Sequence, residues 1–384
     1  FKYVRKGYHK VYIPRSIHHE SKEYVIISIL KEAFQFTDVE SIQFSNDSEI
    51  RTFERGCFFF ASFESLQIPS TVIDLKEGWC DGIRKPSNIT ISLDNPRYKM
   101  YDNSFIIGKS TMEQDDYDVL VLCVKNKKKV KIPSFIKIFS SYSFEGSRDL
   151  HELEFSEDSE LHTIEENALP TDIKSLYIPP KLINLKKHWC SGTSDLNKIK
   201  VSPNNPKYKV YNDEFLIGKS SLEQKNYNVL ALSVRSIQDV KIPSFIEEIG
   251  SSAFFLCQKI KNFEFQKDSK LRIINANGFC RSSIIKMTLP SHLTKICEDA
   301  FFDCSIEKIE IPINSELQSI EKEAFADSHI KVFFIPPLVT MIGENAFNSC
   351  ADLQIIEFNE KLELFALDFL GISHNCTIIM IPVK

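Results

Sequence analysis

A short pattern of apolar residues recurs along the chain and limits the folds that are open to it. The pattern is apolar-x-x-apolar-x-apolar followed by Pro, as at 284–290, 306–312 and 330–336. An Ala-Phe pair or a close variant follows each copy. Four successive pairs are 22, 24 and 22 residues apart: Gly278-Phe279, Ala300-Phe301, Ala324-Phe325 and Ala346-Phe347. The chain is therefore built from copies of one small structural unit.

Each copy has the features of one coil of a solenoid. The apolar run fits a short strand whose apolar side chains point inward, and such strands pair in parallel about 4.8 Å apart. Pro has no N–H to donate and therefore ends the strand. Phenylalanine occurs 30 times, and we expect the repeated Phe to fill the interior from the opposite wall. One coil cannot bury its apolar face alone, so its stability comes from its neighbours.

The period matches the roughly 20–29 residues of leucine-rich repeats. The sequence therefore predicts an α/β repeat solenoid, a leucine-rich-repeat horseshoe of about fifteen coils. We expect a parallel β-sheet on the concave face and short turns or 3₁₀ segments on the convex side. No linker interrupts the repeats, so residues 1–384 are predicted to form a single domain.

A longer period lies over the short one. Trp79-Cys80 and Trp189-Cys190 are 110 residues apart, as are 107–110 and 217–220. The duplicated unit therefore contained about five coils. Each long unit carries two β-rich runs separated by polar residues. This arrangement predicts two projecting β-hairpin insertions, within 98–124 and 208–234.

Composition excludes several classes of protein. Hydrophobic residues make up 43% and charged residues 26% of the chain, as in ordinary soluble proteins. The formal net charge is -5 and the pI is about 6.1, so no overall basic field attracts nucleic acid or anionic membrane. The longest apolar runs are strand-sized, and a bilayer span needs about 20 residues. Because the sequence begins at Phe1, a removed leader and a start inside a longer protein are both open.

The ten cysteines contain no CxxC or CxxxC pair. Cys257, Cys304 and Cys350 each stand three residues after the Phe of a repeat. A thiol at one repeat position favours small buried wall residues. Scattered disulfides are the alternative.

Short motifs that could carry chemistry are incomplete. Gly-Lys-Ser at 108–110 and 218–220 lacks the earlier Gly of a phosphate-binding loop, which Asn103 and Asp213 replace. His18-His19 has no third ligand at metal spacing and is expected in a solvated loop. No GxSxG or HExxH sequence occurs. We therefore expect no catalytic residue, no cofactor, no metal and no enzymatic activity.

The repeat motifs resemble those of the BspA-like leucine-rich-repeat proteins. This family comprises surface antigens of parasitic protists and of some anaerobic and oral bacteria. The resemblance rests on 242–257, which reads Ile-Pro-Ser-Phe-Ile-Glu-Glu-Ile-Gly-Ser-Ser-Ala-Phe-Phe-Leu-Cys, and on Asn204-Asn205-Pro206-Lys207-Tyr208 before the second insertion. Asn167-Ala168-Leu169 and Gly78-Trp79 depart from the Ala-Phe pattern. The resemblance implies a cell-surface or secreted protein of adhesin type.

The residues between the inward anchors of each strand should face outward on the concave sheet. In the middle coils these residues are Lys129, Lys131, Tyr177, Lys198 and Lys200. Toward the C-terminus they become apolar: Val332, Phe334, Ile355, Ile378 and Met380. The lysines fit either a solvated face or a site for an acidic partner. The apolar residues fit either a contact patch or an end that further coils or a cap once covered.

Two functions are compatible with these features. The first is a surface antigen that mediates adhesion by binding a protein of the host cell, the matrix or another cell. The second is an intracellular scaffold or regulator that binds a cytosolic protein, which the lack of disulfide-rich end caps favours. Neither function involves nucleic acid or a small-molecule substrate.

Overall fold

The computed structural model describes residues 10–83, 88–124, 127–359, 371–372 and 376–381. Backbone contacts divide the chain into two compact units. Unit 1 contains Phe1–Ile173 and Pro179–Gly192, and unit 2 contains Lys174–Ile178 and Thr193–Lys384. We describe the two units separately, and the single domain stays a prediction.

The chain is a parallel β-solenoid of about 14 turns. Each coil has a longer strand, a tight turn, a two-residue strand and a broad turn, so two rows of parallel strands run along each unit. In both rows the inward residues are apolar and buried, which confirms the predicted strand pattern. The horseshoe curvature is not confirmed and stays a prediction.

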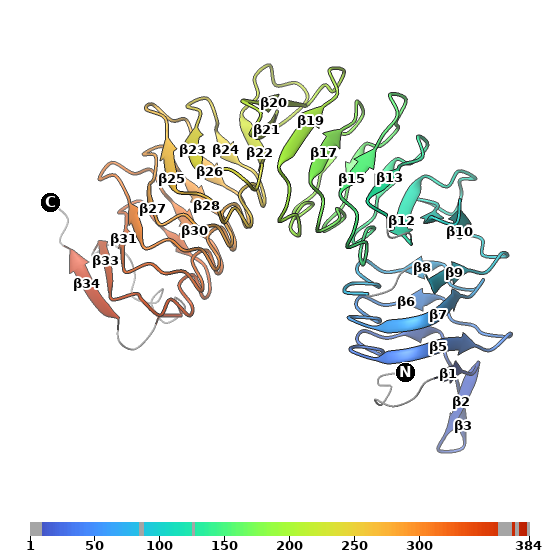
Figure 1. Ribbon diagram of the computed structural model, residues 1–384. Helices are drawn as coiled ribbons and strands as arrows, with labels where there is room; N and C mark the ends of the chain where they lie inside the picture. The colour runs from blue at the N-terminus through green and yellow to red at the C-terminus, as the bar shows by residue number, and fades with distance from the viewer. Residues whose placement is uncertain (1–9, 84–87, 125–126, 360–370, 373–375, 382–384) are drawn as a thin grey trace. The chain divides into compact units, whose positions relative to one another are not determined.

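Unit 1 begins with two parallel sheets of stacked strands (Figure 1). The longer strands are β1 (Lys10–Ile13), β5 (Asp38–Phe44), β7 (Ser62–Ile68) and β9 (Ile89–Ile91). The short ones are β4 (Ser28–Ile29), β6 (Thr52–Phe53) and β8 (Asp74–Leu75). Further along, β13 (Lys129–Lys131) pairs with β15 (Glu152–Glu154). A second short-strand sheet contains β10 (Tyr98–Tyr101), β11 (Phe105–Gly108), β12 (Val119–Cys123), β14 (Ile138–Phe139), β16 (Thr163–Ile164) and β18 (Asn184–Leu185).

Unit 2 repeats this arrangement. The longer strands pair as β17 (Ser175–Ile178) with β19 (Lys198–Val201) and as β23 (Asp239–Ile242) with β25 (Asn262–Phe265). A five-stranded sheet follows: β27 (Lys286–Thr288), β29 (Lys308–Glu310), β31 (Val332–Ile335), β33 (Ile355–Asn359) and β34 (Thr377–Ile381). The second row contains β20 (Tyr208–Tyr211), β21 (Phe215–Gly218), β22 (Val229–Ser233), β24 (Glu248–Ile249), β26 (Ile273–Ile274), β28 (Lys295–Ile296), β30 (Ser319–Ile320) and β32 (Met341–Ile342).

The third wall of each coil is a broad turn that hydrogen-bonds to the next turn. The Phe301 N–H donates to the Ala324 carbonyl oxygen at 2.7 Å. Each of these turns has left-handed residues, such as Asp299 (φ 55°) and Asp303 (φ 50°). Residues with positive φ so close together cannot share a right-handed α-helix. No α-helix occurs in the described residues, so the α component of the predicted α/β class is not confirmed.

The two predicted projecting hairpins are not confirmed either. Within 98–124, β10 pairs antiparallel with β11, and β11 pairs antiparallel with β12. However, β12 then pairs in parallel with β14. The segment therefore extends the short-strand sheet instead of projecting from it. β20, β21 and β22 have the same pairing and the same register shift 110 residues later, as the long period predicts.

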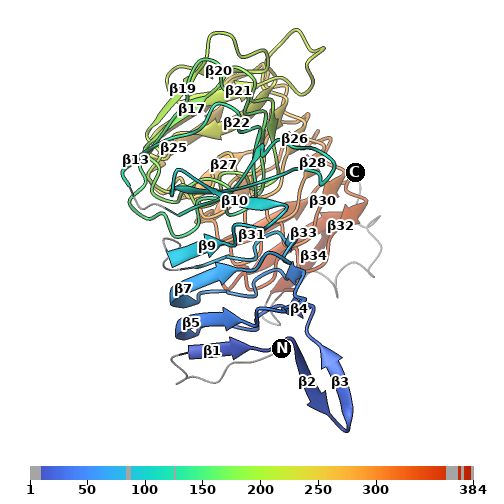
Figure 2. The ribbon, with the colours of Figure 1, turned by 90° about the vertical axis from the view of Figure 1, so that its right-hand side faces the viewer.

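One hairpin was not predicted from the sequence. β2 (Ser16–His19) and β3 (Lys22–Val25) pair antiparallel, and Figure 2 shows them extending beyond β1 and β5. His18 and His19 lie on β2 and are exposed, so they are solvated as expected but do not lie in a loop. The hairpin escaped prediction because its alternation of apolar and polar residues is weak.

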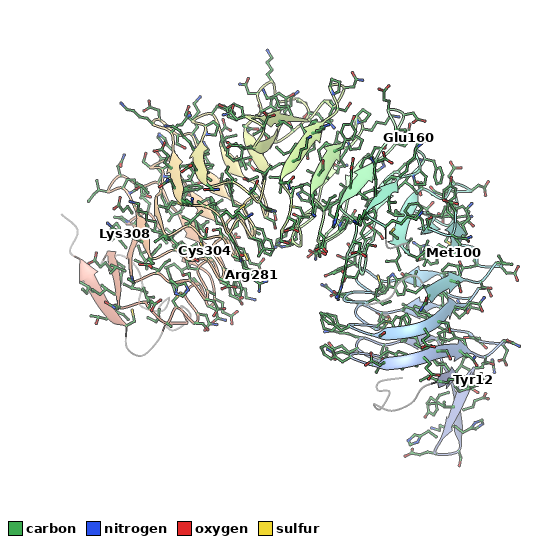
Figure 3. The ribbon with its side chains drawn as sticks, viewed as in Figure 1. Tyr12, Met100, Glu160, Arg281, Cys304 and Lys308 are labelled. Atoms are coloured by element: carbon green, nitrogen blue, oxygen red, sulfur yellow. The ribbon has the colours of Figure 1, made fainter. Side chains whose placement is uncertain are left out.

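Stacked phenylalanines form the centre of unit 2. Phe254, Phe279, Phe301, Phe325 and Phe347 are fully buried, and consecutive rings are stacked with centroids 5.1–5.3 Å apart. Across unit 2, Figure 3 shows Lys308 on the strand side, Arg281 on the turn side and Cys304 between them. The predicted interior role of the repeated Phe is therefore confirmed.

The cysteines lie in the same walls. Nine of the ten are buried and all ten are free thiols, which confirms the prediction of buried wall residues. Burial raises the pKa of Cys304 to about 11, so this thiol stays protonated and unreactive at neutral pH.

We expect Phe301→Ala to lower the free energy of unfolding by about 3–5 kcal/mol, because the change removes a ring stacked between two others and leaves a cavity. Phe245, which is 38% exposed, provides the matched control, and Phe245→Ala should cost far less. Urea denaturation of both variants checks this prediction, and equal stability of Phe301→Ala and the parent would contradict it.

Candidate functional site

The outward side chains of the longer strands form the surface on which the predicted site lies. We call this surface the strand face. Along β13 the burial alternates, with Lys129 and Lys131 exposed and Val130 only 6% exposed. The same alternation recurs in the other longer strands because successive side chains point to opposite sides of a sheet.

In unit 1 the predicted lysines are matched by acids on the next strand. Lys129 lies opposite Glu152 and Lys131 opposite Glu154. The Lys129 ammonium is 2.7 Å from Glu154 and 3.4 Å from Glu152. These exposed pairs contribute little to stability. They do reduce the positive field that an acidic partner would meet at β13.

In unit 2 the remaining predicted lysines lie beside a tyrosine. Lys198 lies opposite Ser175, and Lys200 lies opposite the half-buried Tyr177. Among the described residues, no carboxylate lies within ion-pair distance of Lys198 or Lys200. The structure therefore brings together a tyrosine and two unneutralised lysines on β17 and β19.

The apolar residues of β31 and β33 form a second group in unit 2. Val332 is 42% exposed and lies opposite the half-buried Ile355. Phe334, also half-buried, lies opposite Glu357, which in turn lies opposite Ile379 of β34. We call Val332, Phe334, Ile355 and Ile379 the apolar patch.

Ile378 does not face outward as predicted. It lies opposite Ile356, which is fully buried, so its side chain belongs to the inward column. Ile378 is nevertheless 42% exposed. The backbone of Met380 lies opposite Phe358 in the same column, but its side chain lies outside the described part of the structure. The outward column was shifted by one residue because the sequence of β34 is almost entirely apolar and gives no alternation.

Charged residues border the apolar patch on the side of β29, and Glu357 lies within it. Lys308 lies opposite Val332, and its ammonium is 2.7 Å from Glu310. Lys286 lies opposite Lys308 on the neighbouring strand. An apolar centre with a charged rim is the usual anatomy of a protein-binding surface.

The broad turns of unit 1 contain an acidic cluster that was not predicted. Burial raises the pKa of Glu145 to about 7, and the Asp81 carboxylate adds to the shift. Burial also raises the pKa of Asp81, with Tyr142 as a hydrogen-bond partner. Asp81 and Glu145 are 64 residues apart in the sequence, so only the stacking of coils brings them together.

Among the described residues, no group of three or more His, Cys, Asp and Glu side chains is arranged to hold a metal ion. No described helix is long and apolar enough to cross a membrane.

The fold and the repeat pattern define a leucine-rich-repeat protein. The family model of the BspA-type leucine-rich repeat region matches six copies, over residues 16–110, 123–215, 226–353 and 272–382. The chain therefore belongs to the BspA-type leucine-rich-repeat family, as its motifs suggested. Proteins of this family and fold are generally not enzymes.

Two solved structures of bacterial proteins are similar to this chain. A leucine-rich cell surface protein of Faecalibacterium prausnitzii is 16% identical, with a TM-score of 0.50 over 98% of this chain and 88% of that one. The pneumococcal vaccine antigen PcpA is 15% identical, with a TM-score of 0.49 over 97% and 89%. At this identity the likeness shows the fold alone. A search of curated proteins found none that matches the sequence.

We expect the acidic cluster to make the protein less stable as the pH rises. The folded-state pKa of Glu145 is about 7, above its ordinary value of 4.5. The folded state therefore holds more protons than the unfolded state between pH 4.5 and 7, and stability falls across that window. The total loss should be about 2–3 kcal/mol.

Glu145→Gln should remove most of this pH dependence and stabilise the protein above pH 7. Urea denaturation at pH 5 and pH 8 measures both effects. Glu157→Gln, at an exposed position, serves as the control and should leave the slope unchanged. An unaltered slope in Glu145→Gln would contradict the assignment.

Proposed function

We propose that this chain is a non-enzymatic surface or secreted protein that mediates adhesion by binding other proteins through its strand face. The observation that carries the proposal is the apolar patch of unit 2, with charged residues beside and within it. Its outward side chains leave apolar area on a flat sheet, and such area marks a binding surface more often than scattered apolar residues do.

The strand face suits protein binding for a structural reason. Its side chains lie on a rigid hydrogen-bonded sheet, so little conformational entropy is lost when a partner binds. The half-buried Phe334 is an aromatic side chain of the kind that often dominates binding energy. Lys286 and Lys308 beside the patch and Glu357 within it would set the orientation of the partner through charge.

Tyr177, Lys198 and Lys200 form a second candidate contact region. Unneutralised lysines beside an aromatic ring favour a partner with acidic side chains. Lys129 is less suitable because two glutamates already surround it.

Similar structures support a location at the cell surface. One similar structure is described as a cell surface protein and another as a vaccine antigen. The competing proposal is an intracellular scaffold, and the nine buried free thiols favour it, since reduced cysteines are usual in the cytosol.

Replacing Phe334 with Asp should abolish partner binding while the chain stays folded, because a charge would lie at the centre of the apolar patch. Val332→Asp should have the same effect and tests the patch if Phe334→Asp unfolds. The control is Ile313→Asp, an apolar residue 93% exposed and outside the strand face. Binding to an array of purified extracellular proteins measures the effect, and unchanged binding of both patch variants would remove the patch from consideration.

An antibody against this chain should label intact cells that express the protein. Equal staining of intact and permeabilised cells is the expected result. Staining only after permeabilisation would contradict surface display and favour the intracellular scaffold.

A further inference from the structure

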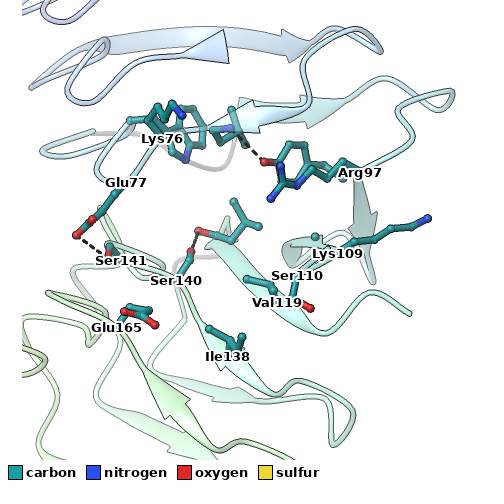
Figure 4. A pocket seen from close by; sticks show the side chains of 15 residues that line it. Lys76, Glu77, Arg97, Lys109, Ser110, Val119, Ile138, Ser140, Ser141 and Glu165 are labelled. Atoms are coloured by element: carbon teal, nitrogen blue, oxygen red, sulfur yellow. Dashed lines mark hydrogen bonds between the residues drawn. The ribbon is translucent and has the colours of Figure 1, made fainter. Parts of the chain in front are cut away.

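A cavity of about 330 Å³ lies in unit 1 where the short-strand row is interrupted. β8 is the last strand of one sheet and β12 belongs to the next. The described chain between them forms β9, β10 and β11, none of which pairs with β8 on that side. The cavity occupies this gap, and Leu75, Val119 and Ile138 form part of its wall (Figure 4).

Two side chains take the place of the missing strand. The Tyr98 hydroxyl accepts a hydrogen bond from the Leu75 N–H at 3.1 Å. Nη1 of Arg97 donates to the Ile73 carbonyl oxygen at 2.7 Å. Gly108 is required beside them, because a Cβ there would come within 2.9 Å of the Tyr98 ring.

The Arg97 guanidinium can still donate a hydrogen bond to a ligand. Its Nε is buried and has no hydrogen-bond partner, which is costly for a charged group. Figure 4 shows the Arg97 guanidinium extending toward the cavity. Two other cations line the cavity. Lys76 is paired with Asp74 at 2.6 Å, and Lys109 extends away from the cavity in Figure 4. An anionic group in the cavity would therefore find Arg97 as its partner.

Hydrogen-bond acceptors line the opposite side. Figure 4 shows Glu77, Ser141 and Glu165 across the cavity from Arg97. Ser141 donates to Glu77 at 3.1 Å, and Ser140 donates to the Val121 carbonyl oxygen at 3.1 Å. A wholly anionic ligand would be repelled by the two glutamates, whereas a ligand with hydroxyl groups would donate hydrogen bonds to them.

The remaining walls are apolar and aromatic. Trp79 and Tyr98 line the cavity beside the aliphatic residues. Aromatic and aliphatic walls combined with a few charged groups are typical of small-molecule sites, and the volume suits one pyranose ring. A free α-amino acid fits less well, because its carboxylate and ammonium are attached to one carbon and the two charged walls lie on opposite sides.

We propose that this cavity binds one acidic monosaccharide, a hexuronic acid, with its carboxylate on Arg97 and its hydroxyl groups on Glu77 and Glu165. The site is separate from the strand face and does not depend on the function proposed for it. The ligand is either a free hexuronic acid or the terminal residue of an acidic glycan, since both present the same carboxylate and hydroxyl groups.

The duplicated sequence provides a natural substitution for the test. Lys207 corresponds to Arg97 at the 110-residue spacing, and it also precedes a tyrosine. Arg97→Lys therefore matches a residue that the repeated fold already accepts. Arg97→Gln removes the charge. Lys109 extends away from the cavity in Figure 4, so Lys109→Gln is the matched control.

Ligand-observed saturation-transfer NMR of the full chain with D-glucuronate, methyl β-D-glucuronide, D-glucose, acetate and L-leucine tests the proposal. Glucuronate should bind more tightly than glucose, acetate or leucine. Arg97→Gln should weaken glucuronate binding roughly tenfold to hundredfold through loss of a charge-assisted hydrogen bond. Arg97→Lys should give an intermediate loss, and Lys109→Gln should give none.

The results of this experiment distinguish the two sources of the ligand and show when the proposal fails. Binding of both glucuronate and its methyl glycoside indicates the end of a glycan, and binding of glucuronate alone indicates the free acid. No glucuronate binding, or tighter binding of glucose, acetate or leucine, overturns the proposal. Equal binding by Arg97→Gln and the parent also overturns it. If Arg97→Gln melts early, Glu165→Ala replaces it, and undiminished glucuronate binding by that variant overturns the proposal.

Discussion

The stacking of one coil on the next is the constraint on which the rest of the structure depends. Each coil places a Phe in the interior, and in unit 2 the rings follow one another at 5.1–5.3 Å. The same step lets the two strand rows and the broad turns hydrogen-bond to their neighbours. Ring contact and backbone pairing therefore require the same spacing between coils. A substitution that altered this spacing at one wall of the coil would disturb the other two walls as well.

This constraint also explains where the solenoid departs from its plain form. In the described part of unit 1 no strand pairs with the far edge of β8, because β9 pairs with β7, and β10 and β11 belong to the next short-strand sheet. Tyr98 and Arg97 bind the exposed backbone groups there, but side chains do not fill the gap as a strand would. The cavity is a consequence of that incomplete filling. A binding site can arise in this way because packing demands are relaxed where the repeat is interrupted.

The sequence predicted the inward half of the structure well and the outward half less well. The repeated Phe, the Pro-terminated strands and the 110-residue duplication all depend on packing, and packing leaves a periodic signal. The α component of the predicted class is not confirmed in the described residues, because left-handed residues such as Glu323 (φ 53°) and Asp327 (φ 56°) have no strong sequence signature. Ile378 was placed on the wrong side because β34 lacks alternation. The acidic cluster and the cavity could not be predicted, because each joins residues from different coils with no common motif.

Inward and outward strand positions are under different constraints. This difference affects how such a protein acquires a function. A coil tolerates many residues at its outward strand positions, because exposed ion pairs such as Lys129–Glu154 contribute little to stability. At Lys198 and Lys200, by contrast, the outward lysines have no carboxylate within ion-pair distance among the described residues. The fold does not require either arrangement. The differences between outward strand positions therefore reflect the surface that each coil presents, and in the apolar patch these positions are apolar instead of charged.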